Sequence, residues 1–352
     1  MKHQTTRYGE IPFYKIGTFG NTADAFISKK LFLEYKTKYS FPKKGDILIS
    51  ASGTIGRAVI YDGKPAYFQD SNIVWIDNDE TLVKNDFLFY AYSNVKWNTE
   101  HTTILRLYND NFRNTLIPLP PPNEQNAIAK ILSDLDHYLC ALDALILKKE
   151  SVKKALSFEL LSQRKRLKGF NQAWQRVRLG DIANYLTSNL SVEQITQQGK
   201  IKVYDVNNFI GYTDTTFISD KPYISIVKDG SVGRVRILPP KTNILSTMGA
   251  LIANHRTTTE FLFYLLSNFD FKNFTSGSII PHIYFKDYKE KTIFLPPLNE
   301  QSAIANILSD LDNEIASLKN KKRQFENIKK ALNHDLMSAK IRVLKKSVLQ
   351  QK

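Results

Sequence analysis

The sequence predicts an α+β protein with two globular domains, each followed by one long helix. Three observations lead to this fold class: an internal repeat at a period of 176 residues, helical apolar spacing after each copy, and strand-like sequence between the copies. The expected order is a globular domain at 1–118, a spacer helix at 119–168, a second globular domain at 169–294, a second spacer helix at 295–344 and a tail at 345–352. We expect the two helices to lie antiparallel as a coiled coil with pseudo-twofold symmetry.

The repeat itself is nearly exact over eighteen residues. Residues 119–136 read LPPPNEQNAIAKILSDLD and residues 295–312 read LPPLNEQSAIANILSDLD, so that 15 of the 18 positions are identical. The same offset aligns Lys153-Lys154-Ala155-Leu156 with Lys329-Lys330-Ala331-Leu332. The chain is therefore a tandem duplication.

Each copy predicts a helix that begins just after its prolines, because proline is not tolerated inside a helix. Asn123 and Asn299 suit the N-cap position, and Glu124 and Glu300 then lie near the positive end of the helix dipole. Spacings of three and four residues predict the apolar seams, at Ile128, Leu132, Leu135, Leu139, Leu142, Ile146, Val152 and Leu156 in the first copy and at Ile304, Leu308, Leu311, Ile315, Leu318, Phe325, Ile328, Leu332 and Leu336 in the second. Helices of about 40–45 residues would extend roughly 60–65 Å.

Short runs rich in β-branched residues predict strands in the globular domains, for example at 46–50, 72–76 and 224–227. The two domains resemble each other weakly. The loop Ser52–Arg57 parallels the loop Asp229–Arg234, and Arg106 aligns with His282. Two long antiparallel helices would carry these unlike domains at opposite ends, which suits a target with two unlike halves about 10 base pairs apart, or a multiple of that distance.

The charge distribution indicates a polyanionic partner. The net charge is +15, and two helical segments hold most of it: residues 148–168 carry a net +6 and residues 319–346 a net +8. These stretches are either solvated helix faces or contacts to phosphate or to acidic partners. No run approaches the roughly 18 apolar residues of a membrane span. The N-terminus lacks the apolar core of a secretory signal and Cys140 is the only cysteine, so we expect a cytoplasmic protein.

The pattern LPP-x-x-EQ-x-x-I-x-x-x-L, at Leu119–Leu132 and again at Leu295–Leu308, resembles the repeats of type I restriction–modification specificity subunits. The run Val177-Arg178-Leu179-Gly180-Asp181-Ile182 is similar to the usual opening of a target recognition domain in that family. The resemblance implies a non-catalytic subunit that reads a bipartite asymmetric DNA site, one half by each domain, with helices that fix the gap. It also implies two DNA methyltransferase subunits and two restriction/translocase subunits as partners, which would hold S-adenosylmethionine, ATP and magnesium.

The first domain departs from this pattern. About 25 residues precede Gly199 in the second domain, whereas eight precede the equivalent Gly9, so the expected opening strand and helix of the first domain are missing.

Candidate binding residues come from polar positions in the paired loops. The turn loops contain glycines for a tight strand connection, and their backbone N–H groups, with the nearby arginines, would meet phosphate. An arginine or histidine among apolar neighbours is a candidate for contact with a base edge, and the alternative is an ordinary exposed loop residue. The run 69–72 is a candidate for base reading, and the alternative is a capping turn. The DNA-binding candidates are Ser52, Thr54, Arg57, Gln69, Asn72, Arg106, Ser231, Arg234, Asn243 and His282, and the partner-binding candidates are Glu124, Gln125, Glu300 and Gln301.

Catalytic and metal-binding motifs were sought for comparison. The sequence has no phosphate-binding G-x-x-x-x-G-K-[ST] loop and no methyltransferase Asn/Asp-Pro-Pro-Tyr/Phe quartet, and its six histidines lack a metal-ligand spacing. We therefore expect no catalytic, cofactor or metal site. The alternatives are a standalone methyltransferase or nuclease, and a bipartite DNA-binding regulator or scaffold without a methyltransferase partner.

Overall fold

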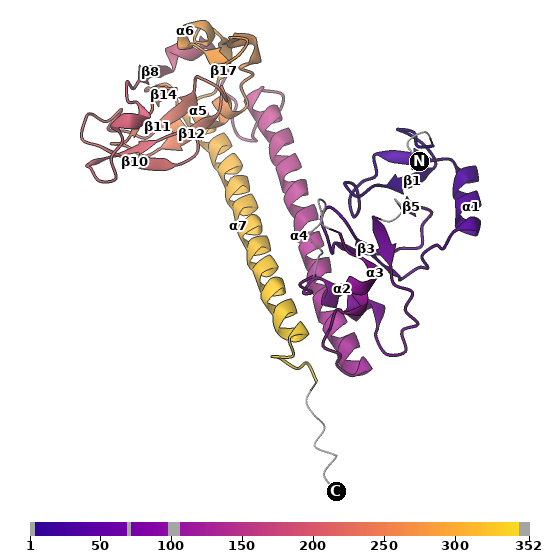
Figure 1. Ribbon diagram of the computed structural model, residues 1–352. Coiled ribbons are helices and arrows are strands. Elements are labelled where there is room, and N and C mark those ends of the chain that lie inside the picture. Colours follow the sequence, from indigo (N-terminus) through magenta and orange to yellow (C-terminus); the bar gives the residue numbers. More distant parts are fainter. Residues whose placement is uncertain (1–3, 69–71, 98–105, 345–352) are drawn as a thin grey trace. The chain divides into compact units, whose positions relative to one another are not determined.

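The computed structural model describes residues 4–68, 72–97 and 106–344. The chain divides into two compact units, and each unit takes part of both long helices. Unit 1 comprises residues 1–143 and 321–352, and unit 2 comprises residues 144–320. Each unit contains one globular part and one segment of each long helix (Figure 1).

The two long helices are α4 (Pro122–Leu161) and α7 (Leu298–Met337), each of 40 residues. The predicted start just after the prolines is confirmed for α7, whereas α4 begins at the last proline of its run, Pro122. The predicted N-caps are wrong. The helices begin before Asn123 and Asn299, and the N–H groups of Gln125 and Gln301 already bond the carbonyls of Pro121 and Pro297. Proline fits the first turn because the N–H groups there have no partner within the helix.

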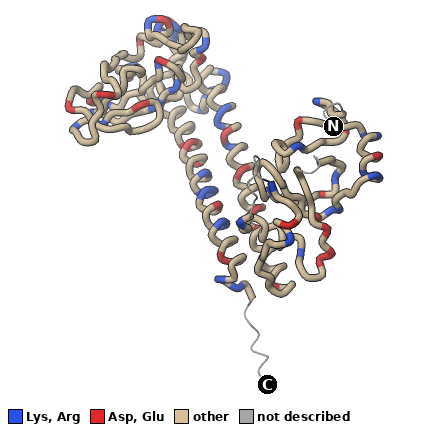
Figure 2. Tube along the Cα trace, viewed as in Figure 1, with Lys and Arg blue, Asp and Glu red and all other residues tan. Residues whose placement is uncertain are grey.

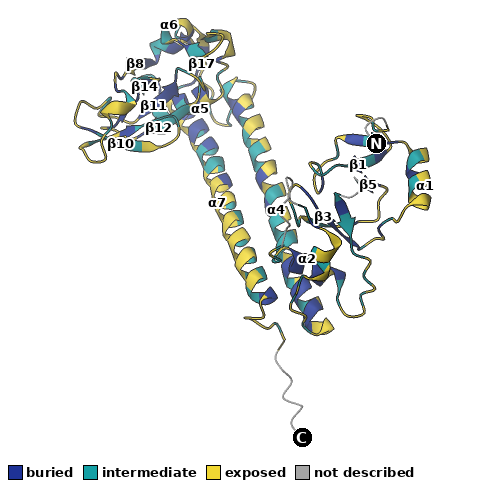
Figure 3. Cartoon of the chain, viewed as in Figure 1, coloured by how far each residue is buried: buried dark blue, intermediate teal, exposed yellow. Residues whose placement is uncertain are grey.

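Burial along the helices follows the predicted seam with one paired exception. Buried residues gather in the first turns of both helices (Figure 3), where Ile128, Leu132, Ile304 and Leu308 are enclosed. The exception is Val152 and its equivalent Ile328, which are about half exposed, so their assignment to the seam is wrong. The exception falls at one position of the repeat, which shows that the duplication holds in three dimensions.

The helical segments run antiparallel within each unit, as expected. In unit 1, Asp136 pairs with Lys329 and Asp143 with Lys322, and in unit 2, Asp312 pairs with Lys153 and Glu314 with Lys149. One residue number rises as its partner's falls, which is the mark of an antiparallel register.

The globular part of unit 1 holds two three-stranded sheets, ordered β2-β1-β5 and β4-β3-β6. Its elements are β1 (Ile11–Tyr14), β2 (Ala25–Ile27), α1 (Lys29–Lys38), β3 (Ile47–Ser50), β4 (Ala58–Ile60), β5 (Tyr67–Phe68), β6 (Ile73–Trp75), α2 (Asn85–Tyr92) and α3 (Asn109–Arg113). Ser28 caps α1 by accepting from the N–H of Leu31. Helix α1 accounts for the extra length between Ser28 and Ser52 that distinguishes this domain from the second.

The globular part of unit 2 follows the same plan, but its main sheet has four strands, ordered β12-β11-β14-β8. The smaller sheets are β10-β9-β13, β17-β7 and β15-β16. Its elements are β7 (Gln175–Arg178), β8 (Ala183–Thr187), β9 (Ile201–Tyr204), β10 (Phe209–Thr213), β11 (Tyr223–Val227), β12 (Val235–Leu238), β13 (Asn243–Ile244), β14 (Met248–Ala253), α5 (Thr259–Ser267), β15 (Thr275–Ser276), β16 (His282–Ile283), α6 (Phe285–Tyr288) and β17 (Thr292–Leu295), with 3-10 turns η1 (Leu179–Asp181), η2 (Val192–Gln194) and η3 (Lys272–Phe274). Strands β3, β6 and β11 confirm the predicted strand runs.

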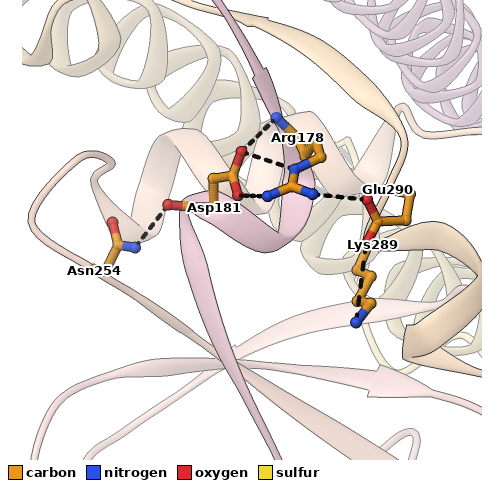
Figure 4. Close-up of polar contacts among 5 residues, drawn as sticks. All are labelled: Arg178, Asp181, Asn254, Lys289 and Glu290. Carbon is orange, nitrogen blue, oxygen red and sulfur yellow. Dashed lines mark hydrogen bonds and ion pairs between the residues drawn. The ribbon is translucent and has the colours of Figure 1, made fainter.

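The start of this domain is held by one polar cluster (Figure 4). Arg178, at the end of β7, donates to both oxygens of Asp181 and to Glu290, and Asn254 donates to the carbonyl of Asp181 at 3.0 Å. The Arg178 guanidinium lowers the pKa of the Asp181 carboxyl below its ordinary value. The cluster fixes the turn that joins β7 to β8.

Candidate nucleic-acid interface

Two equivalent turns carry half of the DNA-binding candidates. The loop Ser52–Arg57 joins β3 to β4, and the loop Asp229–Arg234 joins β11 to β12, so the predicted tight strand connections are confirmed. Each turn needs two glycines with positive φ, 67° and 79° at Gly53 and Gly56 and 82° and 80° at Gly230 and Gly233. A Cβ at Gly56 would also lie 2.2 Å from Trp97.

These turns present polar side chains to solvent. Thr54 and Arg57 are exposed in unit 1, and Ser231 and Arg234 are exposed in unit 2. The Arg234 guanidinium donates to Asn207 Oδ1 at 2.8 Å, which holds it beside the turn. Exposed hydroxyl and guanidinium groups of this kind suit contact with phosphate oxygens.

A second chain segment lies against each turn at equivalent positions. Isolated β-bridges join Ser52 to Arg106 and Asp229 to His282, and the N–H groups of Leu107 and Ile283 bond the carbonyls of Ala51 and Lys228 at 2.8 and 2.9 Å. The predicted equivalence of Arg106 and His282 is therefore confirmed.

The polar set beside the turn of unit 1 combines a hydroxyl, an amide and a guanidinium. Ser52 Oγ donates to Asn72 Oδ1 at 2.9 Å, and the half-buried Arg106 has its guanidinium 5.9 Å from the ring of Tyr108. Gln69 was predicted to join this set and lies outside the described residues.

The equivalent set in unit 2 has different chemistry. His282 Nδ1 lies 2.6 Å from Asp229 Oδ1. If Nδ1 carries a proton for Asp229, the carboxylate fixes the ring orientation, and Nε2 is left for a further contact. The sequence analysis named Asp229 only as the first residue of its loop and did not predict it as a site residue. The signal was the alignment of an acidic residue with the candidate Ser52.

Asn243 is a correction to the predicted site. It is 4% exposed in β13, its Nδ2 donates to the carbonyl of Thr216, and its Oδ1 accepts from the N–H of Ile244, so it cannot meet a base. The residue equivalent to Asn72 is Thr247. The carbonyl of Asn72 accepts from the N–H of Ala51, and the carbonyl of Thr247 accepts from the N–H of the equivalent residue, Lys228. Thr247 is exposed beside the turn. The sequence analysis selected the Asn243 amide, which the fold uses internally.

The four predicted partner-binding residues are also placed elsewhere than expected. Glu124, Gln125, Glu300 and Gln301 are all buried. Glu300 accepts from Arg166 Nε and Nη2 at 3.2 and 2.7 Å, and Glu124 is held in the same way by Arg342. Since these groups bond within their own units, we assign them an internal role in place of partner contact.

The glutamines join the helix start to the globular part. Gln125 Oε1 accepts from the N–H of Lys84, and its Nε2 donates to the carbonyls of Leu82 and Pro120 at 2.9 and 2.8 Å. Gln301 repeats this arrangement with Thr258, Arg256 and Pro296. The Glu-Gln pair of the repeat motif therefore fixes the start of each helix to the globular part of the same unit.

A second set of contacts between helix and globular part lies about three helical turns further along. Tyr90 donates to Asp136 at 2.8 Å and Tyr264 to Asp312 at 2.9 Å, and these carboxylates pair with Lys329 and Lys153. Burial and the neighbouring carboxylate raise the pKa of both phenols.

The basic stretches are partly used by the helices themselves. Basic and acidic residues are interspersed along both helices (Figure 2). Ion pairs at the helices and just after their ends involve Lys149, Lys153, Arg166, Lys319, Lys322, Lys329 and Arg342. Lys148, Lys154, Arg164, Lys168 and Lys330 remain exposed. The charge is thus divided between holding the helices together and facing outward.

Two further findings limit the chemistry of the described residues. Within 4–68, 72–97 and 106–344, no group of three His, Cys, Asp or Glu residues is arranged to hold a metal ion. No helix in that part of the chain is both long and apolar enough to cross a membrane.

Comparison with known proteins gives consistent matches. The family model for the type I restriction modification DNA specificity domain matches residues 1–150 and 171–327. A putative type I restriction enzyme specificity subunit of Haemophilus influenzae is 62% identical over 137 residues, which are 39% of this chain and 36% of that protein. The putative MjaX specificity subunit of Methanocaldococcus jannaschii is 29% identical over 337 residues, covering 85% of this chain and 79% of that one.

Solved structures share the fold. The crystal structure of the type I restriction–modification S subunit from M. genitalium has a TM-score of 0.62 at 20% identity and covers 96% of this chain and 91% of its own. Two family domains in tandem, with mixed helix and sheet and two long helices, match the fold class that the sequence predicted. The chain belongs to the family of type I restriction–modification DNA specificity subunits, whose members are non-catalytic.

Proposed function

We propose that this chain reads a bipartite, asymmetric DNA site for a type I restriction–modification complex, with one half-site read by each unit. One observation carries the proposal: two structurally equivalent loop sets hold different polar side chains, Arg106 with Asn72 in unit 1 and His282 with Thr247 in unit 2. Equivalent positions with unlike chemistry suit the reading of two unlike half-sites.

The side chains divide by chemistry into two classes. Arg106 can donate two hydrogen bonds to guanine O6 and N7, and the free Nε2 of His282 can meet one base edge. Thr54, Arg57, Ser231 and Arg234 are exposed at the turns and suit phosphate contacts, which position the chain without specifying sequence. Gln69 remains a candidate for base contact.

The partners in this proposal are double-stranded DNA, two DNA methyltransferase subunits and, in the restriction complex, two restriction/translocase subunits. S-adenosylmethionine, ATP and magnesium belong to those subunits. Because the Glu-Gln pairs are buried, we place partner contact on exposed apolar side chains of the helices instead, at Leu145, Leu147 and Val152 and at Ile328. The helices would set the gap between the half-sites.

The test is partner-dependent methylation. The purified chain is mixed with DNA and labelled S-adenosylmethionine, with and without a type I methyltransferase subunit. We expect methyl transfer to one defined site only when both proteins are present. Methyl transfer by the chain alone would contradict the proposal, and tight site-specific binding by the chain with no response to the methyltransferase would favour a standalone regulator.

A further inference from the structure

The two units differ at one edge of their globular parts. In unit 2, β17 pairs with β7 and β14 pairs with β8. The equivalent positions in unit 1 are residues 116–119 and strand β6. Among the described residues no strand pairs with residues 116–119, and the sheet β4-β3-β6 ends at β6. We call residues 116–119 together with the free side of β6 the open edge.

The open edge exposes a leucine whose equivalent in unit 2 is enclosed. Leu295, which pairs with Gln175 of β7, is 4% exposed, whereas its equivalent Leu119 is 51% exposed. In unit 2 the covering segment also places Val177, Leu179 and Ile182 in the core. Unit 1 therefore has the receiving half of an apolar contact whose other half is supplied, in unit 2, by residues 174–187.

The backbone of the open edge is also suited to a strand. In unit 2 the N–H of Leu179 bonds the carbonyl of Lys291, and the register pairs Ile293 with Val177 and Leu295 with Gln175. Bonded pairs alternate in an antiparallel ladder, so Ile293 and Leu295 face β7 with their N–H and C=O groups and Phe294 does not. The only proline of the open edge, Pro118, falls at the Phe294 position, where its missing N–H removes no bond.

The Glu–Arg pairs of the two units differ in one further hydrogen bond. In unit 2 the indole of Trp174 donates to the buried carboxylate of Glu300 at 2.9 Å, beside Arg166. In unit 1 the equivalent carboxylate, Glu124, is held by Arg342, and the three tryptophans of the chain all lie elsewhere or in unit 2. The backbone N–H of Val343 also bonds the buried Glu124 carboxylate, so in unit 1 a backbone group takes the place of the Trp174 indole.

We propose that the open edge of unit 1 binds an extended polypeptide segment with the chemistry of residues 174–187. Such a segment has an aromatic N–H donor, then basic and apolar residues in alternation, then a Leu-Gly-Asp-Ile turn and a second strand. It would pair antiparallel with residues 116–119 and then with β6, and cover Leu119. This inference concerns a protein partner and does not depend on DNA binding.

The experiment uses the full chain and a labelled peptide of sequence AWQRVRLGDIANYLT, which is residues 173–187. We expect saturable binding by fluorescence anisotropy, and slower amide hydrogen exchange at Ile117, Leu119 and residues 73–75. Leu119→Asp should weaken binding at least tenfold, because a charge would be buried beneath the added strand. The matched control is Leu82→Asp, at a position of unit 1 that is also exposed, and it should leave binding unchanged. A peptide with Asp at the Val177 and Leu179 positions should not bind.

Three results would overturn the proposal. The first is the absence of saturable binding. The second is protection confined to residues 292–295, which means that the peptide exchanges with β7 of unit 2. The third is a dimer, seen by sedimentation, that protects residues 116–119 without peptide and excludes it, because the occupant is then a second copy of the chain.

Discussion

Unit 1 and unit 2 are alike where the globular part meets the helices and unlike where polar loops face outward. Both units hold their helix starts with a buried glutamate paired with an arginine, a glutamine that bonds the globular part, and a Tyr–Asp–Lys set. The loop sets differ, with Ser52 and Arg106 in one unit and Asp229 and His282 in the other. The residues of the repeated motif therefore serve the folded structure, whereas the diverged loops carry the differences that the reading of two unlike half-sites requires.

The largest expected effect comes from the enclosed leucines at equivalent positions of the helices. Leu132 and Leu308 are fully buried, so Leu132→Ala and Leu308→Ala should each lower the free energy of unfolding by about 3 kcal/mol, through lost burial and the cavity left behind. Chemical denaturation measures this. Val152→Ala and Ile328→Ala are the matched controls and should change it by no more than about 0.5 kcal/mol. Equal effects at all four positions would mean that the seam assignment is wrong.

A smaller asymmetry is expected at the two Glu–Arg pairs. Glu300 also accepts from Trp174, and Arg166 is less exposed than Arg342. Arg166→Ala should therefore destabilise unit 2 more than Arg342→Ala destabilises unit 1, because it leaves a more deeply buried carboxylate without its cation. Amide hydrogen exchange in α2 and α5 reports on each unit separately. A larger effect of Arg342→Ala would contradict the asymmetry.

We expect Asn243 to act in folding and Thr247 to act in DNA recognition. Asn243→Ala removes a buried side chain with two hydrogen bonds, and should lower the free energy of unfolding by about 1–2 kcal/mol without changing the methylated sequence. Thr247→Ala should leave stability unchanged and relax one position of the site. Thermal melts and sequencing of methylated DNA test both variants. A change of site in the Asn243 variant would restore it as a contact residue.

The smallest expected effect depends on pH. The Arg342 guanidinium lowers the pKa of Glu124 below its ordinary value near 4.5. The stabilisation is therefore present above that value and is lost as pH falls through the lowered pKa. Glu124→Gln should make the unfolding free energy of unit 1 less dependent on pH below about 4.5. A pH slope identical to that of the unchanged chain would show that the pair does not act in this way.

The sequence predicts the scaffold well because its signals are local. Prolines and apolar spacing fix the helices, and glycines with positive φ fix the two turns. The sequence could not reveal that Glu124 and Gln125 are internal, because their partners are Arg342 and Lys84, far along the chain. It also could not separate Asn243 from Thr247, since both are polar residues beside a strand and only the sheet decides which of them is enclosed.

The most direct test of the central claim is the methylated sequence of a complex reconstituted with methyltransferase, compared among the unchanged chain, Arg106→Ala and His282→Ala. We expect a bipartite site, with Arg106→Ala relaxing one half only and His282→Ala the other half only. The expected loss is roughly 10- to 100-fold in discrimination at one base pair, the range of a single good base contact. A contiguous site, or one substitution that alters both halves, would contradict the account.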